Sequence, residues 1–342
     1  MYDYIIVTHI PVFYKVNLYN ELAKKLNLLV IFIASNTVEK RADDFISLNN
    51  IDFEYKVLFD GDFQNRNIYN NIKKLNSILK EIEYKKLLVS GWDLKEFWYL
   101  VFTIKKQKNC LALESTILES KTKGLKGLIK RVFLDRISTV FASGKLHREL
   151  LDKLNYKGSI KTTRGVGIIN KPEFIYNEKV YQKRFLFIGR LSKVKNVEIL
   201  IGIFNKLEDY KLTIIGTGED EEYLKSIANK NIIFLGAVEN KDIKDKFQEN
   251  DIFILPSISE SWGLVVEEAL YFGLPVMVSQ NCGLCELIEN DLNGYVFNPS
   301  DTKEIKNKIL GIDNKKYSEL IDCVKKVSID EKDKVQVKVY DI

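Results

Sequence analysis

The stretch DIFILPSISESWGLVVEEALYFG, residues 251–273, gives the clearest indication of the fold of this chain. Its first part, DIFIL, is a short apolar run followed by a proline, which predicts a buried strand that ends in a loop. The residues from Leu264 to Gly273 predict a helix that stops at a glycine. A buried strand followed directly by a helix is typical of parallel α/β sheets.

Glu260 and Glu268 stand eight positions apart in this stretch, on the predicted loop and the predicted helix. Taken alone, the two acids fit the surface of an amphipathic helix as well as a site. Carboxylates at a strand end suit sugar hydroxyls, because charge-assisted hydrogen bonds are the stronger kind. The backbone from Trp262 through Gly263 to Leu264 leads into the helix N-terminus, where N–H groups can meet an anion.

Strand and helix patterns alternate along all 342 residues, and the rhythm restarts at FLFIGR, residues 185–190. This length fits two domains of about 150–170 residues each. We therefore expect a doubly wound α/β fold in each half. The expected parts are an N-terminal domain over 1–168, a linker over 169–184, a C-terminal domain over 185–312, and a helical tail over 313–342 that can pack back on the N-terminal domain.

The charge balance and the cysteines limit which partners and which cellular compartment we expect. The net charge is only +5, from 52 basic and 47 acidic residues, so we expect no nucleic-acid partner. The opening MYDYIIVTHI has no basic n-region and predicts a first strand rather than a signal peptide. With four cysteines and no long apolar span, we expect a cytoplasmic protein with reduced thiols. Peripheral attachment to the inner face of a membrane stays open.

Two cations follow the first strand of the second half. Arg190 comes directly after the strand and Lys195 opens the next helix. They suit a diphosphate, because arginine binds phosphate oxygens bidentately and lysine acts as a point charge. A solvated basic loop is the alternative.

The nearby IIGTGED does not fit the dinucleotide-binding fingerprint GxGxxG, because position 221, where the third glycine would fall, is Glu. Gly216 and Gly218 are therefore interpreted as a turn that lets a ligand ring approach the backbone.

Several motifs, taken in their order along the chain, resemble those of one family. They are GRLSKVKN (189–196), IIGTGEDEEYL (214–224), FLGAV (234–238), the stretch 251–279 and CGLCELIENDLNGYVF (282–297). Together they resemble the donor-binding domain of the GT4 family of retaining glycosyltransferases, whose acidic signature Glu260 and Glu268 meet. That family has the GT-B fold, two Rossmann-like domains facing across a cleft. The resemblance is strong over about 185–300 and much weaker over 1–165.

The resemblance implies a role for each matched residue. Arg190 and Lys195 would stabilise the donor diphosphate during catalysis, and Glu260 would contact hydroxyls of the transferred sugar. Glu268 would hold the ribose. The residues implied to bind the nucleotide sugar are Glu268, Gly263, Leu264, Trp262, Gly216, Gly218, Ala237 and Val238. Trp262 would supply an aromatic wall.

The implied reaction moves a sugar from a UDP- or GDP-sugar to a hydroxyl of a saccharide or lipid-linked acceptor. It retains the anomeric configuration, needs no obligatory metal or other cofactor, and belongs to surface-glycan biosynthesis. The alternatives are a nucleotide-sugar epimerase or hydrolase, and a sugar-nucleotide-binding protein without turnover.

The N-terminal half carries weaker signals. His9 and Glu114 each follow an expected strand and are candidates for the acceptor side. Asp60-Gly61-Asp62 resembles a metal-binding DxD, but an Asp-Gly turn is the favoured interpretation. Cys282 and Cys285 lack a second cysteine pair, so two loop cysteines are favoured over a zinc site. We expect His147 on a helix surface.

Residues 121–136 predict a basic amphipathic helix. Leu125, Leu128, Ile129, Val132 and Phe133 fall on one face, and Lys126 and Lys130 lie toward another. Such a helix can dock on anionic lipid. The favoured interpretation is an ordinary helix whose apolar face packs on the core.

Overall fold

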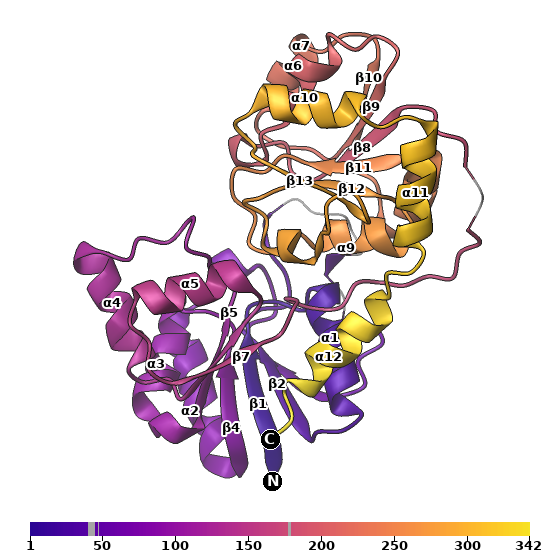
Figure 1. Cartoon of the computed structure of the whole chain (residues 1–342). Helices are drawn as coiled ribbons and strands as arrows, with labels where there is room; N and C mark the ends of the chain where they lie inside the picture. Colours follow the sequence, from indigo (N-terminus) through magenta and orange to yellow (C-terminus); the bar gives the residue numbers. More distant parts are fainter. Residues whose placement is uncertain (40–44, 47, 177–178) are drawn as a thin grey trace. The chain divides into compact units, whose positions relative to one another are not determined.

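The computed structural model describes residues 1–39, 45–46, 48–176 and 179–342 (Figure 1). The chain divides into two compact units. Unit 1 comprises Met1–Ile168 with Lys332–Ile342, and unit 2 comprises Ile169–Glu331. Each unit is a Rossmann-like α/β domain with a parallel sheet, so the expected fold class is confirmed. Within the described ranges, no helix is both long and apolar enough to cross a bilayer.

The sheet of unit 1 has seven strands in the order β3-β2-β1-β4-β5-β6-β7, all paired in parallel. Their bounds are β1 (Tyr2–Thr8), β2 (Leu28–Phe32), β3 (Glu54–Val57), β4 (Tyr84–Val89), β5 (Asn109–Leu113), β6 (Thr139–Ala142) and β7 (Ser159–Thr162). The chain builds outward from β1 in one direction and then returns to add β4 on its other side. The carboxyl ends of β1 and β4 therefore form a switch point, where open α/β sheets bind ligands.

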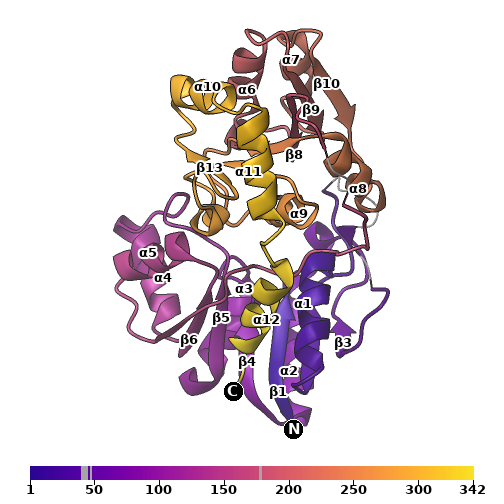
Figure 2. The same ribbon diagram turned by 45° about the vertical axis from the view of Figure 1, so that its right-hand side comes forward.

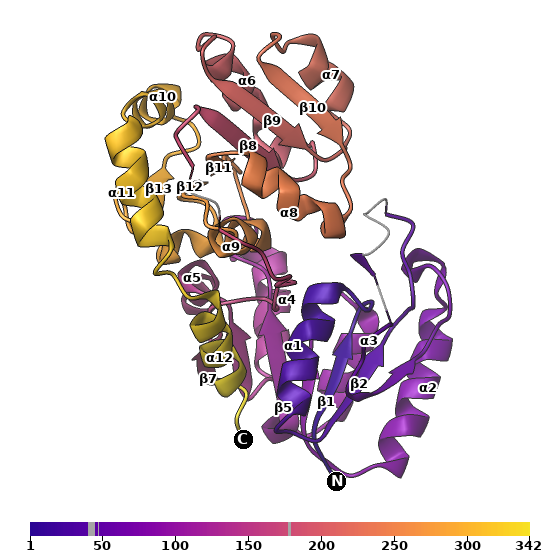
Figure 3. The same cartoon turned by 90° about the vertical axis from the view of Figure 1, so that its right-hand side faces the viewer.

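The alternation of side chains along β1 divides the core of unit 1 into two layers. Ile5 and Val7 pack with α2 (Ile68–Glu81), α3 (Lys95–Thr103), α4 (Gly124–Leu134) and α5 (Lys145–Lys153). Tyr4 and Ile6 pack with α1 (Phe13–Ala23) and with the end of the chain. In Figure 3, α1 and α2 lie on opposite sides of this sheet.

The last eleven residues belong to unit 1. They include most of α12 (Ile329–Lys338), which lies beside α1 in Figure 2. Tyr340 stacks on Phe141 with ring centroids 4.4 Å apart, and its carbonyl accepts a 3.1 Å hydrogen bond from the Tyr4 hydroxyl. The tail predicted over 313–342 is thus divided, because α11 (Asn314–Val324) lies in unit 2.

The sheet of unit 2 has six parallel strands in the order β10-β9-β8-β11-β12-β13. The strands are β8 (Arg184–Ile188), β9 (Lys211–Ile215), β10 (Ile232–Gly236), β11 (Ile252–Leu255), β12 (Val276–Ser279) and β13 (Gly294–Phe297). The helices are α6 (Val197–Phe204), α7 (Glu221–Ser226), α8 (Asn240–Glu249), α9 (Leu264–Tyr271), α10 (Thr302–Leu310) and α11. Figure 1 shows α6 and α10 on one face of this sheet and α9 on the other. The switch point of this sheet lies between β8 and β11.

The predicted linker is attached to unit 2. Its described residues before β8 form no helix or strand. The Phe174 ring packs on Phe272 at 5.2 Å, and the Lys179 ammonium donates to the Asn250 carbonyl at 2.8 Å.

Candidate functional site

In unit 2, the predicted catalytic residues cluster at the switch point. Arg190 and Lys195 follow β8, and Glu260 follows β11, the neighbouring strand. The Lys195 ammonium donates to the Glu260 carboxylate, and the two side chains are only 21% and 16% exposed. The structure therefore joins a residue expected for the diphosphate with one expected for the sugar. A partly buried ion pair is less screened by salt than a surface one.

Asn196 holds Lys195 in this position. Its backbone is left-handed, with a φ of 55°, a conformation that asparagine tolerates better than most residues. Its side-chain amide donates to the carbonyls of Pro256 at 3.2 Å and Pro299 at 2.9 Å. These bonds tie the lysine loop to the chain that follows β11 and to the chain that follows β13. This positioning role was not among the predicted ones.

The turn at Gly216 and Gly218 has a structural role beside the one expected. A Cβ at Gly216, where φ is 127°, would lie 2.0 Å from the Gly189 carbonyl oxygen. A Cβ at Gly218 would lie 2.2 Å from that of Leu191. The missing side chains therefore let the protein's own loop, which carries Arg190, lie against this turn; the approach of a ligand ring to its backbone stays a prediction.

Trp262 is inside the domain. It is 1% exposed, and its indole N–H donates to the fully buried Glu267 carboxylate at 2.5 Å. The predicted aromatic wall is therefore corrected: in this structure the ring supports the loop from within. Gly263 follows with a φ of 97° and begins α9 without a side-chain cap. The backbone N–H groups from Leu264 onward are therefore placed where an anion can meet a helix N-terminus.

Cys282 and Cys285 are free thiols. The buried Cys282 thiol donates to the Trp262 carbonyl at 2.9 Å, and burial raises the pKa of this thiol. A Cβ at Gly263 would lie 2.8 Å from the Cys282 sulfur. Cys282 thus packs beneath the loop that carries Glu260.

Glu268 lies on α9, partly buried. Burial, with a smaller contribution from the neighbouring Glu267, raises the pKa of the Glu268 carboxyl to about 8. Near neutral pH this carboxyl is therefore mostly protonated, so it can donate one hydrogen bond as well as accept others.

Ala237 and Val238 follow β10 at the far edge of the sheet. The chain beside them is held by a 2.7 Å bond from the Gly216 amide to the Gly236 carbonyl. With β9 and β8 between them, β10 and β11 are about 14 Å apart at the usual strand spacing. These two residues are therefore not brought into direct contact with the Lys195–Glu260 pair.

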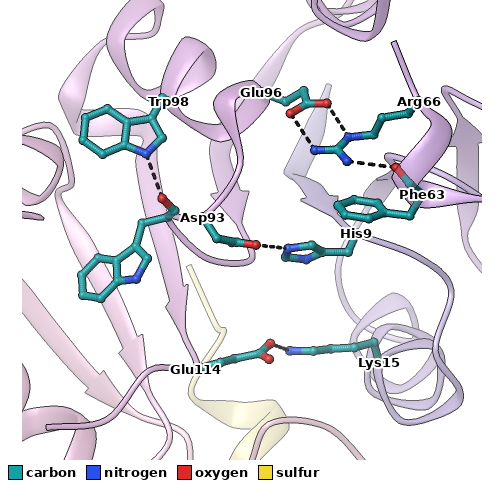
Figure 4. Close-up of polar contacts among 9 residues, drawn as sticks. His9, Lys15, Phe63, Arg66, Asp93, Glu96, Trp98 and Glu114 are labelled. Carbon is teal, nitrogen blue, oxygen red and sulfur yellow. Dashed lines mark hydrogen bonds and ion pairs between the residues drawn. The ribbon is translucent and has the colours of Figure 1, made fainter. Parts of the chain in front are cut away.

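In unit 1, His9 follows β1 and Asp93 follows β4, so both lie at that sheet's switch point. The His9 Nε2 and an Asp93 oxygen are 2.8 Å apart (Figure 4). Burial opposes ionisation of Asp93, but the hydrogen bond and charge of His9 outweigh it and lower the pKa of that carboxyl. An ionised carboxylate only accepts, so Nε2–H donates.

The histidine ring is wedged among aromatic rings. It packs edge-on against Phe97 at 5.2 Å and tilted on Phe63 at 5.7 Å. Phe63 is itself covered by the Arg66 guanidinium, 3.8 Å from the ring centroid, which also pairs with the buried Glu96 (Figure 4).

A second charged pair lies nearby. The Lys15 ammonium on α1 donates to the Glu114 carboxylate, which follows β5 (Figure 4). Lys15 is 5% exposed, and although burial opposes the charged form, Glu114 outweighs it and raises the pKa of Lys15. Lys15 and Asp93 were not predicted. A lysine on an apolar helix gives no sequence signal of a buried ion pair, although Asp93 does follow a strand.

These pairs line a cavity of about 370 Å³ within unit 1. Its walls are Thr8, His9, Ile10, Val12, Tyr14, Lys15, Thr37, Glu39, Phe45, Phe63, Gln64, Asp93 and Glu114. The two residues predicted for the acceptor side, His9 and Glu114, therefore share one cavity. Its polar and aromatic walls suit a polar ligand with apolar faces, such as a sugar.

Two N-terminal expectations have structural outcomes. His147 is completely buried on α5 rather than on the surface, and burial lowers its pKa to about 4. Its ring points into the core because α5 packs its Leu150 and Leu151 side on the sheet. Asp60 accepts a 2.8 Å hydrogen bond from the Ser35 hydroxyl and precedes Gly61 with a φ of 142°.

Parts of this chain are similar in sequence to known glycosyltransferases. Residues 170–326, nearly all of unit 2, match the family model of group 1 glycosyl transferases. An uncharacterised 41.2 kDa protein in the cps region of Klebsiella pneumoniae is 27% identical over 216 residues, covering 63% of this chain and 54% of that protein. The O-antigen biosynthesis glycosyltransferase WbnH of Escherichia coli is 38% identical over 117 residues, 34% of each chain. The matches therefore span about half and a third of these relatives.

Among solved structures, Anabaena HepE in complex with UDP and glucose is similar, with a TM-score of 0.68 at 16% identity, covering 95% of this chain and 94% of that one. A likeness at this identity establishes the fold. The chain accordingly has the two Rossmann-like domains of the GT-B glycosyltransferase architecture expected from its sequence.

Proposed function

We propose that this protein is a retaining glycosyltransferase of GT4 type. It moves a sugar from a nucleotide diphosphate sugar to a hydroxyl of a saccharide or lipid-linked acceptor. The observation that carries the proposal is the Lys195–Glu260 pair at the switch point of unit 2, inside the segment that matches group 1 glycosyl transferases. Relatives named for O-antigen biosynthesis support a role in making surface glycans.

The donor half of the reaction follows from charge. Breaking the bond between sugar and phosphate leaves negative charge on the diphosphate, and Arg190 and Lys195 stabilise it where it develops. Lys195 is paired with Glu260 in the structure, so an arriving diphosphate replaces Glu260 as its partner. The released carboxylate then accepts hydrogen bonds from sugar hydroxyls.

The rest of the donor extends along the strand ends of unit 2. Glu268 and the amides at Gly263 and Leu264 hold the ribose and phosphates, and Ala237 and Val238 border the base. A uridine donor is supported by the UDP bound in HepE, and a GDP-sugar remains the alternative. The reaction uses no enzyme nucleophile: the leaving phosphate assists deprotonation of the acceptor, and no metal is required.

The acceptor occupies the cavity of unit 1. Because the Asp93 carboxylate accepts from Nε2–H, Nδ1 is the ring nitrogen of His9 that is left to bond a sugar hydroxyl. Glu114 supplies a further acceptor oxygen beside Lys15. The protein would meet a lipid-linked acceptor at the inner face of a membrane, as a cytoplasmic, peripherally attached enzyme.

A panel of UDP- and GDP-sugars tests the proposal by thermal stabilisation and by donor turnover, with product configuration read by NMR. Glu260→Ala should abolish transfer while leaving the folded state intact, because the sugar loses its hydroxyl contact. Glu222→Ala, an exposed acid on α7, is the matched control. Transfer should persist in EDTA. Unchanged turnover in Glu260→Ala, or an inverted product, would refute the assignment.

A further inference from the structure

Helix α4 of unit 1 turns its apolar side to solvent. Leu125 is 72% exposed, Leu128 54%, Ile129 44% and Val132 42%. The helix packs on unit 1 through Gly127, Phe133 and Leu134 instead. The favoured sequence interpretation, an apolar face on the core, is therefore wrong for every member of that face except Phe133. We call Leu125, Leu128, Ile129 and Val132 the outer face of α4.

The outer face is a continuous stripe. At 100° per residue its four side chains fall within an arc of about 100°. Scattered exposed apolar residues need no explanation, but four on one arc of one helix form a patch of the kind that marks an interaction site.

The segment that carries this patch is mostly basic, with the acids Glu119 and Asp135 just beyond its two ends. The charged residues of 121–134 are Lys121, Lys123, Lys126, Lys130 and Arg131. Lys121, Lys123 and Lys126 are exposed. Lys130 is partly buried, lying 5.2 Å from the Trp92 ring centroid and donating to the Lys121 carbonyl at 3.3 Å. That bond holds the preceding basic segment against the helix.

We propose that the outer face of α4 and its flanking lysines dock on the surface of an anionic lipid bilayer. The apolar stripe enters the boundary between headgroups and acyl chains, and the lysines contact anionic headgroups. A second copy of the chain is a poorer occupant, because a two-fold contact through this face would bring the same cations together. The inference deepens the proposed function by naming where a lipid-linked acceptor is met, and to that extent rests on it.

Flotation with phosphatidylcholine vesicles, with and without phosphatidylglycerol, tests the docking. The full chain should float with the anionic vesicles and less so as salt rises, because screening weakens the lysine contacts. Leu128→Glu combined with Val132→Glu should reduce the affinity for anionic vesicles by at least about tenfold, because docking would then bury two negative charges in the apolar boundary. Lys126→Ala should weaken binding to the anionic vesicles but not to the vesicles of phosphatidylcholine alone.

Matched controls lie on α2 of the same unit. Tyr69→Glu, at a 76% exposed position, is the control for the new negative charges. Lys73→Ala, at an exposed position, is the control for the removed lysine. Both should float like the unchanged protein, and all variants should unfold at the same temperature.

The proposal is overturned if the Leu128/Val132 variant floats as well as the unchanged protein, or if the unchanged protein does not float. The proposal is also overturned if the unchanged protein is a dimer in the absence of lipid and the Leu128/Val132 variant is a monomer. Sugar transfer to a soluble acceptor should survive in the variant, so docking and catalysis fail separately.

Discussion

At the residue scale, the candidate sites are charged pairs placed where two neighbouring strands end. Lys195–Glu260 bridges β8 and β11, and His9–Asp93 bridges β1 and β4. Both pairs stand at the switch point of their own sheet. The same topology has thus placed a basic side chain beside a carboxylate in each unit, although the two sequences that do it share no motif.

Glu268 supplies a prediction about pH. Its pKa of about 8 lies above the ordinary value of 4.5, so the folded state binds the proton more tightly than the unfolded chain. The stabilisation by this proton is complete below pH 4.5 and is lost as pH rises through 8. Relative to Glu268→Gln, which cannot ionise, the unchanged protein should become less stable over that window.

Urea unfolding of both proteins between pH 5 and 8 gives the difference in free energy of unfolding, with Glu222→Gln as the exposed control. A difference that stays flat across this range would show that Glu268 titrates normally.

At the scale of elements, the turn after β9 supports the loop after β8. Gly216→Ala introduces a methyl group 2.0 Å from the Gly189 carbonyl, at a φ of 127° that alanine resists. We expect a loss of roughly 1–3 kcal/mol in the free energy of unfolding. Because the displaced loop carries Arg190, donor turnover should fall as well.

Gly202 on α6 is the matched glycine, since a Cβ there meets nothing within 4 Å. Gly202→Ala should be neutral or stabilise the protein by roughly 0.5–1 kcal/mol, through better helix propensity. Equal effects of the two substitutions in urea unfolding would contradict this account of the turn.

At the scale of the whole molecule, the chain ends inside the domain in which it began. Tyr340, 4% exposed, joins the layer formed by Tyr4 and Phe141. Tyr340→Ala should lower the free energy of unfolding of unit 1 by roughly 3–5 kcal/mol, the usual range for removing a buried aromatic ring. Ile342→Ala, at a 56% exposed position, should cost almost nothing. Thermal unfolding of both variants is the measurement, and a Tyr340→Ala protein as stable as the Ile342→Ala control would place the end of the chain outside the core.

Much of the fold was predictable because its signals are local. Buried parallel strands are continuous apolar runs, so β1, β8 and β11 were expected from MYDYIIVTHI, FLFIGR and DIFIL. The edge strand β7 carries the mixed pattern SIKT and was not predicted. Edge strands bury less surface, so their sequences are less constrained.

Local sequence patterns were enough to predict the α/β class, the division near residue 169, and the positions of Arg190, Lys195, Glu260 and Glu268 on strand-end loops and a helix. These follow from periodicity and spacing along neighbouring residues. Tertiary structure alone decided the direction in which side chains face. It buried Trp262 and His147, exposed the apolar side of α4, and paired Lys195 with Glu260 across 65 residues. Such outcomes depend on which elements pack together, and no local pattern encodes that choice.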